Sequence, residues 1–362
     1  MLTTPHGVVK TPAFLPCATH GSIRGVDQRL VADQNFELIL ANAYHLYLRP
    51  GIELIERLGG LHAFMGWKGA IFTDSGGFQA FALSKLVRLR RDGIEFRSHL
   101  DGSLHALTPE RVILIQEQLG VDIATCLDVC TGFPAPEREV AAAVDQTNIW
   151  AERSIKTWHK KTMHLYGMVQ GSIYLRERER SAKFLRTLPF SGFAIGGNMY
   201  TFGECIANLE KEKPQMWSVV MATTDILPAN KPRHLLGVGE PRDLIRGVAC
   251  GVDTFDCVMA TRIARHATAW IRQKSDSWQY QRIDLNQSRW SQDSAPLDEY
   301  CLCLTCQSPY SRAYLHHLAR ENDPLLGALL SLHNLSFLKT LMQALRESIL
   351  TGVDLHSILS VN

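Results

Sequence analysis

Short apolar runs recur along most of this chain, and each ends on a polar or glycine-rich turn. Runs that are continuously apolar, rather than alternating, are typical of strands buried on both faces of a parallel sheet. We therefore predict a parallel strand within each run. The runs cover residues 37–45, 70–79, 122–130, 165–172, 192–198, 234–241 and 252–258.

The longer segments between these runs carry helical patterning. In 108–120 (TPERVILIQEQLG), Thr108 suits the N-cap, Pro109 the first turn and Gly120 the stop. Similar segments lie at 136–158 and 240–251. Seven or eight strand–helix units predict a (β/α)8 barrel over residues 1–270, with a doubly wound open sheet as the alternative.

Polar residues and glycines gather where the predicted strands end. In a barrel, the carboxyl ends of the strands carry the active site. Any one of these residues could equally be a turn residue or a helix cap, so it is their number that favours an active site. They are Asp74, Asp128, Gln170, Gly196, Gly197, Gly237, Gly239 and Asp256.

The stretch 251–265 (GVDTFDCVMATRIAR) contains two aspartates. Side chains alternate along a strand, so Asp253 and Asp256, three residues apart, face opposite sides. Asp256 is nearer the carboxyl end of the strand, where a barrel keeps its chemistry. Asp253 is deeper, where a carboxylate needs a partner. We therefore predict a chemical role for Asp256 and a structural role for Asp253.

The strand–helix pattern ends near residue 270, and a polar segment leads to a C-x-C-x-x-C cluster. Cys301, Cys303 and Cys306 suit a tetrahedral Zn²⁺ ion. A fourth ligand from histidine would close the site and make the metal structural. The candidates are His316, His317 and His333, the last expected to begin a helical run. We predict a zinc-binding subdomain with the last barrel helices at 271–345, and a helical tail at 346–362.

Composition limits the classes of function that are open to this chain. The chain has 362 residues, of which 46% are apolar, so it can build a sizeable core. The formal charge is only +2, so nucleic-acid binding would need a local basic patch. The N-terminus lacks a signal-like apolar region, and no run approaches the roughly 18 apolar residues of a membrane span. Six scattered cysteines fit reduced thiols. We expect a cytoplasmic protein that does not enter a membrane.

Several motifs, taken in order, resemble the queuine tRNA-ribosyltransferases, or tRNA-guanine transglycosylases. The resemblance spans nearly the whole chain and implies a (β/α)8 barrel with a zinc subdomain. It also implies exchange of guanine at wobble position 34 of GUN-anticodon tRNAs for a 7-deazaguanine, either preQ1 or queuine. The motifs are TDSGGFQ (73–79), MVQGS (168–172), GFAIGG (192–197), LLGVGEPRDLIRGV (235–248), GVDTFDCVMATR (251–262) and the cysteine cluster with its downstream histidines.

The resemblance also implies roles for individual residues. Asp256 matches the nucleophile, and Asp74 the second catalytic carboxylate. Base contacts match Asp128, Gln170, Gly196 and Gly197, with walls from Phe78 and Leu236. The tRNA contacts match Arg262 and Arg265. The zinc ligands match Cys301, Cys303, Cys306 and His333. The implied partners are the tRNAs for Asp, Asn, His and Tyr, a 7-deazaguanine base and a second copy of the chain in a homodimer.

The chain departs from the bacterial pattern at three places. Val129 stands where an acidic residue is usual, the turn GGNMYTFGE (196–204) is longer, and CVMATRIARHA (257–267) lacks a proline, an asparagine and a glycine. The first two changes fall at the expected base pocket, so we hypothesise a reshaped pocket that admits queuine. Glu204 is a candidate contact to the incoming base.

Two other functions remain open at this point. One is a non-catalytic tRNA-binding subunit of the same fold, against which the presence of both Asp74 and Asp256 argues. The other is an unrelated metallo-hydrolase that uses the cysteine cluster. A closed set of three cysteines and one histidine leaves no open position for water, which favours a structural metal.

Overall fold

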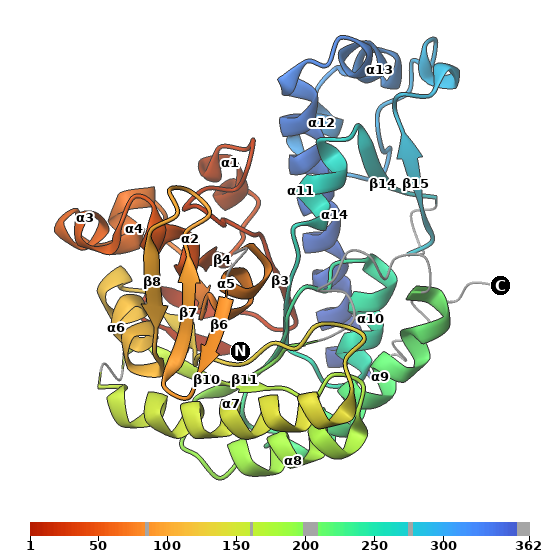
Figure 1. The fold of residues 1–362 in the computed structure, drawn as a ribbon. Coiled ribbons are helices and arrows are strands. Elements are labelled where there is room, and N and C mark those ends of the chain that lie inside the picture. The colour runs from red at the N-terminus through yellow and green to blue at the C-terminus, as the bar shows by residue number, and fades with distance from the viewer. Residues whose placement is uncertain (84–86, 160–161, 198–208, 274–277, 353–362) are drawn as a thin grey trace.

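The computed structural model of the chain describes residues 1–362 apart from 84–86, 160–161, 198–208, 274–277 and 353–362 (Figure 1). Its centre is an eight-stranded parallel sheet. In spatial order the strands are β3 (Ala13–Leu15), β13 (Thr254–Asp256), β12 (Arg233–Leu235), β11 (Gly192–Ile195), β10 (His164–Val169), β9 (Ile123–Thr125), β5 (Ala70–Asp74) and β4 (Leu38–Asn42).

The two edges of this sheet meet. A parallel bridge joins Cys17, just after β3, to Leu40 of β4, and the amides of Ala18 and Leu40 donate to the carbonyls of Leu40 and Pro16. The predicted (β/α)8 barrel is therefore confirmed, and the open sheet is excluded. All seven predicted strands are present. The eighth, β3, was not predicted, because Pro12 and Pro16 flank its apolar run and prolines are typical of turns.

Helices surround the barrel, and the best predicted of them is α6 (Pro109–Leu119). Thr108 Oγ1 accepts from the amide of Arg111, and Gly120 ends the helix in the left-handed region. The other barrel-side helices are α1 (Gln28–Asp33), α2 (Ala43–Leu48), α3 (Ile52–Arg57), α4 (Gly60–Met65), α5 (Gly77–Leu83), α7 (Glu137–Thr157), α8 (Leu175–Leu185), α9 (Leu209–Ile226), α10 (Pro241–Ala249) and α11 (Met259–Ala264).

Two small antiparallel sheets are added to the barrel. An N-terminal hairpin consists of β1 (Leu2–Thr4) and β2 (Gly7–Val9). The excursion between α5 and α6 forms a three-stranded sheet of β6 (Val87–Arg90), β7 (Gly93–Arg97) and β8 (Leu104–Leu107).

The chain beyond α11 forms a subdomain at one end of the long helix α14 (Pro324–Thr351), while the rest of α14 lies along the barrel (Figure 1). The subdomain contains β14 (Thr268–Arg272), β15 (Tyr280–Asp284), η3 (Ser288–Trp290), α12 (Leu304–Gln307) and α13 (Arg312–Arg320). Because α14 contacts α10, α11 and β3 as well as β14 and α12, the barrel and the subdomain share one helix.

The start of α14 corrects one expectation. Asp323 caps the helix by accepting from the amide of Leu325, and Pro324 occupies the first turn. His333 therefore lies in the middle of the helix and does not begin a run. The expected boundary between 345 and 346 also falls inside α14.

Within the described residues, α14 is also the helix long and apolar enough to cross a membrane by length and composition. However, 67% of its most apolar window is buried inside the protein, which is typical of a core helix.

A carboxylate ties three elements together at the amino-terminal end of the barrel. Asp122, just before β9, accepts from His6 Nδ1 at 2.8 Å, from His62 Nε2 at 3.1 Å and from the amide of Ile71 at 2.8 Å. The two imidazole rings stack with centres 3.6 Å apart. Two rings that bind one ion at about 2 Å would hold their centres at least about 4.5 Å apart. The geometry therefore fits two donors on one carboxylate, and we call this group the Asp122 clasp.

Candidate active site

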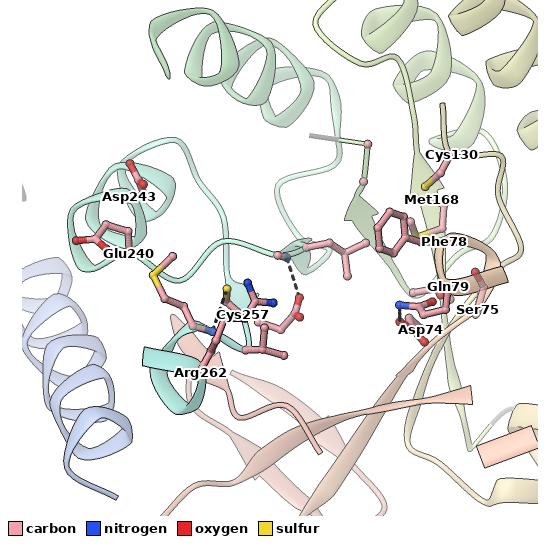
Figure 2. A pocket seen from close by; sticks show the side chains of 18 of the residues that line it. Asp74, Ser75, Phe78, Gln79, Cys130, Met168, Glu240, Asp243, Cys257 and Arg262 are labelled. Atoms are coloured by element: carbon pink, nitrogen blue, oxygen red, sulfur yellow. Dashed lines mark hydrogen bonds between the residues drawn. The ribbon is translucent and has the colours of Figure 1, made fainter. Parts of the chain in front are cut away.

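A cavity of about 770 Å³ opens at the carboxyl ends of the barrel strands (Figure 2). Most of the expected site residues meet here although they are spread over nearly 190 positions of sequence. Gln170 and Arg265 do not line the cavity directly. Those that do are Asp74, Phe78, Asp128, Gly196, Gly197, Leu236, Asp256 and Arg262.

Asp256 is the last residue of β13, and its carboxylate is held mainly through one oxygen. Oδ1 accepts from the amide of Gly237 and from Nε2 of His234, both at 3.1 Å. The thiol of Cys17 lies 3.6 Å from Oδ2. The residue is 8% exposed, so it is held in place at the cavity wall with one oxygen more strongly engaged than the other.

Asp253 lies at the opposite end of the same strand. Its Oδ2 accepts from the amide of Arg233 at 2.9 Å, which supplies the partner that a deep carboxylate needs. Burial raises the pKa of Asp253 above its ordinary value. Asp253 does not line the cavity, so the two aspartates of this stretch have separate environments.

Asp74 ends β5 and has an asymmetric environment. Oδ2 accepts from Gln79 Nε2 at 3.1 Å (Figure 2) and from Asn42 Nδ2 at 2.7 Å. Oδ1 is buried without a partner among the described atoms. Burial, and then the neighbouring charge of Asp256, raise the pKa of Asp74 to about 7. A carboxyl with that pKa can both donate and accept a proton near neutral pH.

Asp128 lies deeper in the cavity, within a polar cluster. Gln170 Nε2 donates to Oδ2 at 2.5 Å, Ser75 Oγ donates to Oδ1 at 3.2 Å, and the thiol of Cys130 lies 3.6 Å from Oδ2. Burial raises the pKa of Asp128, although these three bonds oppose the shift. The carboxylate is thus fixed in orientation and able to accept from the donor edge of a flat ring.

The loop after β11 approaches this cluster closely because it is made of glycine. Gly197 has a φ of +58°, and a Cβ there would lie 2.2 Å from Gln170 Oε1. A Cβ on Gly196 would lie 2.9 Å from Met168 Cε. Side chains at either position would fill the space next to Asp128, so glycine is what keeps this part of the cavity open.

Sequence reasoning did not find Arg178, which holds these loops together. Its guanidinium is fully buried and donates to the carbonyls of Val169, Ser172 and Gly197. Burial lowers the pKa of Arg178 to about 10. In the charged run 175–181 (LRERERS), this arginine cannot be told from its solvated neighbours.

Apolar side chains complete the cavity next to the polar cluster. The half-buried Phe78 and the buried Met168 line its wall (Figure 2). The half-buried Leu236 lines it as well. A slot with an aromatic wall, a carboxylate and backbone groups at its end suits a flat polar ring.

Two exposed arginines follow the nucleophile candidate. Arg262 lines the cavity, whereas Arg265 lies outside it and donates to the carbonyl of Thr261 at 3.0 Å. Burial, and then repulsion by Arg24 and Arg262, lower the pKa of Arg265. Arg24, which the sequence did not single out, thus belongs to a cluster of three like charges near the cavity that a polyanion could neutralise.

The cysteine cluster forms a buried site with His333. The sulfur atoms of Cys301, Cys303 and Cys306 and a ring nitrogen of His333 all lie within 4.8 Å of one another. His333 Nε2 donates to the carbonyl of Trp270 at 2.6 Å, so Nδ1 turns its lone pair towards the sulfurs at 3.3 and 3.7 Å.

These four residues fit tetrahedral Zn²⁺ and leave no position open for water. The other candidate histidines are not part of this group, and His316 instead bonds the carbonyl of Leu285. None of the eight described cysteines forms a disulfide.

Two of the three departures from the family pattern can be located. Val129 is buried, and its amide donates to Thr147 Oγ1 at 3.0 Å. The carbonyl of the buried Ala260 accepts from Asn334 Nδ2 at 2.9 Å, while His266 is exposed. Most of the turn 196–204, with Glu204, lies outside the described residues.

The fold is a closed barrel, and its cavity has two carboxylates beside a slot for a flat polar ring and arginines at the rim. These features define a class of barrel enzymes that act on a nucleobase or nucleotide. The chain belongs to the queuine tRNA-ribosyltransferase family, whose family model matches residues 1–356.

Curated relatives agree with this assignment. A queuine tRNA-ribosyltransferase of a Thermoanaerobacter species is 45% identical over 351 residues, which is 96% of this chain and 89% of the relative. One from Caldanaerobacter subterraneus is 44% identical over the same coverage. One from Dehalococcoides mccartyi is 42% identical over 348 residues, 96% of this chain and 84% of the relative.

Proposed function

We propose that this protein is a tRNA-guanine transglycosylase, which exchanges guanine at wobble position 34 of tRNA for a 7-deazaguanine. The observation that carries the proposal is that Asp74, Asp128 and Asp256 line one cavity. Asp128 suits recognition of a base, and the other two suit chemistry at the bond between base and ribose. The match of the family model over residues 1–356 supports the same activity.

The first step is attack by Asp256 on C1′ of the ribose. An Oδ–C1′ bond forms as the C1′–N9 bond breaks, and the electron pair leaves with guanine, which takes up a proton. The product is an ester between the enzyme and the tRNA. The incoming base then loses a proton, attacks C1′ and displaces the carboxylate. Two displacements at one carbon give net retention.

Asp74 supplies and removes the protons in this scheme. With a pKa of about 7, its carboxyl is substantially populated in both forms near neutral pH. The protonated form can donate to departing guanine, and the ionised form can accept from the incoming base. Its unpartnered Oδ1 could instead accept from the ribose 2′-hydroxyl, and a pH profile distinguishes the two roles.

Base recognition uses the edge that guanine and 7-deazaguanines share. Asp128 accepts from N1–H and the 2-amino group, while Gln170 and the amide of Gly197 donate to O6. In the structure Gln170 Nε2 bonds Asp128, so base binding exchanges that bond for contacts with the ring. Phe78 and Leu236 cover the ring faces.

The target nucleotide must leave its stack to reach a barrel mouth, so the anticodon loop is splayed on binding. Arg262 and Arg265, with Arg24, would hold its phosphates. The tRNA substrates implied by the family are those for Asp, Asn, His and Tyr, with GUN anticodons. We also propose that the chain works as a cytoplasmic homodimer, which sedimentation of the purified protein tests.

The incoming base is preQ1 or queuine, and we favour queuine. Val129 replaces the acidic residue usual beside Asp128, and its side chain is buried rather than polar. Competition between labelled guanine-tRNA and each base, followed by mass spectrometry of the nucleoside formed, tests this preference. Efficient incorporation of preQ1 without use of queuine would contradict it.

The activity itself is tested with Asp256→Asn. We expect the variant to lose base exchange and the covalent tRNA adduct, because an amide is a poor nucleophile. Asp253→Asn is the matched control, since it changes the same residue type three positions away and should retain both. A non-catalytic tRNA-binding subunit would show no exchange or adduct in the native protein either, and that result would overturn the proposal.

A further inference from the structure

We propose that His234 is a positioning residue for the nucleophile: its imidazole N–H fixes one oxygen of Asp256, so that the other oxygen attacks C1′. This inference rests on the proposed transglycosylase function and adds a residue to its machinery. His234 lies on β12 in a segment, PRHLLGVG, whose sequence shows only a buried strand.

The pairing of β12 with β13 places His234 against the nucleophile. His234 pairs with Thr254, so the two side chains lie on the same face of the sheet, and Asp256, two residues further along β13, shares that face. His234 Nδ1 lies 2.9 Å from Thr254 Oγ1, and Nε2 lies 3.1 Å from Asp256 Oδ1. Threonine, histidine and aspartate therefore form one chain of hydrogen bonds.

The direction of each bond follows from the chemistry of the groups. An ionised Asp256 only accepts, so Nε2 of His234 must carry a proton. Nδ1 lies within hydrogen-bond distance of the hydroxyl of Thr254, so this hydroxyl holds the ring in the same orientation. His234 is completely buried, and the ring of Phe72 contacts it edge-on with centres 4.6 Å apart. Water therefore cannot replace either bond in the folded protein.

These bonds make the two oxygens of Asp256 unequal. Oδ1 has two N–H donors, from His234 and from the amide of Gly237. Oδ2 has only the thiol of Cys17 at 3.6 Å, and a thiol is a weak donor. Oδ2 is therefore the attacking atom, and Oδ1 becomes the carbonyl oxygen of the ester.

The same donors act again when the ester breaks. As the C1′–Oδ2 bond breaks and the C1′–N9 bond of the new base forms, the electron pair returns to the carboxylate and negative charge reappears on Oδ1. Fixed N–H groups aimed at an oxygen where charge develops stabilise the transition state, as in an oxyanion hole. Losing the imidazole donor should therefore slow the second displacement more than the first.

The test compares His234→Met with His234→Gln. Methionine has a similar volume and no donor, whereas glutamine can place an amide N–H near the position of Nε2. We expect kcat for base exchange to fall about 10- to 100-fold in His234→Met, the range for one hydrogen bond to a charged group. The KM for tRNA should stay within about threefold, and a larger share of enzyme should carry the adduct. His234→Gln should recover most of the rate.

Thr254→Val provides a second test that leaves the imidazole in place. Without the hydroxyl, the ring loses one of its two hydrogen bonds, so kcat should fall less than in His234→Met, with an unchanged KM. In the His234→Met background the same change should have no further effect on kcat, because Thr254 acts through His234. Thermal unfolding of each variant identifies any loss that is due to folding alone.

The outcomes separate this inference from the function on which it rests. If the native protein exchanges guanine and His234→Met does so at the native rate, the positioning role is wrong and the function stands. Equal losses in His234→Met and His234→Gln, or a loss confined to KM, would also overturn it. If the native protein forms no adduct and exchanges no base, the proposed function fails and the positioning role fails with it.

Discussion

Asp74 and Asp256 end two strands of one barrel, and their partners give them different properties. Asp256 Oδ1 is held by two N–H donors, which suits a nucleophile that must keep its orientation. Asp74 is buried with one oxygen lacking a partner, which favours its neutral form. Local contacts, more than residue type, thus divide the chemistry between two identical side chains.

The raised pKa of Asp74 predicts a pH-dependent cost in stability. The carboxyl has a pKa of about 7 in the folded protein and an ordinary value of 3.8, so the folded state binds the proton more tightly. The native protein should therefore lose stability as pH rises from about 4 to about 7, by up to about 4 kcal/mol.

Asp74→Asn should remove this cost. We expect the variant to match the native free energy of unfolding near pH 4.5 and to exceed it near pH 8, as measured by urea denaturation. It should also lose exchange activity by about 10²- to 10⁴-fold, the range for general acid–base catalysis. A difference in stability that does not change between the two pH values would contradict the raised pKa.

At the scale of elements, the Asp122 clasp fastens the β1–β2 hairpin and α4 to the amino-terminal end of β9. One buried carboxylate accepts from His6, His62 and the amide of Ile71, each of which is at least 51 residues from Asp122 in sequence. Burial alone would raise the pKa of Asp122, but the bonds from His62 and His6 outweigh it and the pKa is lowered. The amino-terminal end of a barrel contributes to stability rather than to catalysis, so we assign the clasp a structural role.

Asp122→Asn is expected to weaken this end of the barrel. Because the folded pKa is depressed, the carboxylate stabilises the protein above its ordinary value of 3.8, and this stabilisation is lost as pH falls through the folded pKa. We expect a loss of about 2–4 kcal/mol in urea unfolding at pH 7, shrinking towards pH 3.

Hydrogen exchange of the β1–β2 amides should rise in the same variant, since the hairpin loses its anchor through His6. Asp253→Asn is again a suitable comparison, because Asp253 lies at the same end of the barrel and its carboxylate accepts from the amide of Arg233 alone among the described residues. If the hairpin amides of Asp122→Asn exchange as slowly as those of the native protein, the clasp is not needed to anchor the hairpin.

On the scale of the whole molecule, α14 connects the barrel to the candidate metal site. The helix packs on β3 and α10 along part of its length and supplies His333 near its middle. His333 and its neighbour Asn334 also bond the backbone of Trp270 on β14. A loss of structure at the candidate metal site should therefore also destabilise α14, the last helix of the barrel.

Removal of zinc should accordingly affect folding before chemistry. We expect chelation, or Cys303→Ser, to lower the Tm and to reduce helicity together with activity, as measured by circular dichroism and a zinc assay of the protein. Restored zinc should recover both after chelation. A metal-free protein that keeps its native Tm but has lost activity would instead indicate a catalytic metal.

Much of this organisation follows from the sequence, because its causes are local. Continuous apolar runs require two covered faces, Thr108 and Gly120 start and stop a helix wherever it packs, and three closely spaced cysteines suit zinc. Side-chain alternation and position along one strand favour Asp256 over Asp253 as the reactive carboxylate. The proposed catalytic pair and the proposed base-pocket residues follow from the family motifs, each of which lies at the end of one strand.

Only the tertiary structure decided what depends on contacts between distant segments. The pairing of residues near β3 with β4 closes the barrel, and the register of β12 against β13 puts His234 beside Asp256. Arg178 looks like a solvated residue in its own helix, and its burial depends on carbonyls from two other loops. The pKa of Asp74 depends on burial and on a charge 182 positions away. Local patterns specify elements, but electrostatics and hydrogen bonding act through space, so they are fixed only once the barrel has closed.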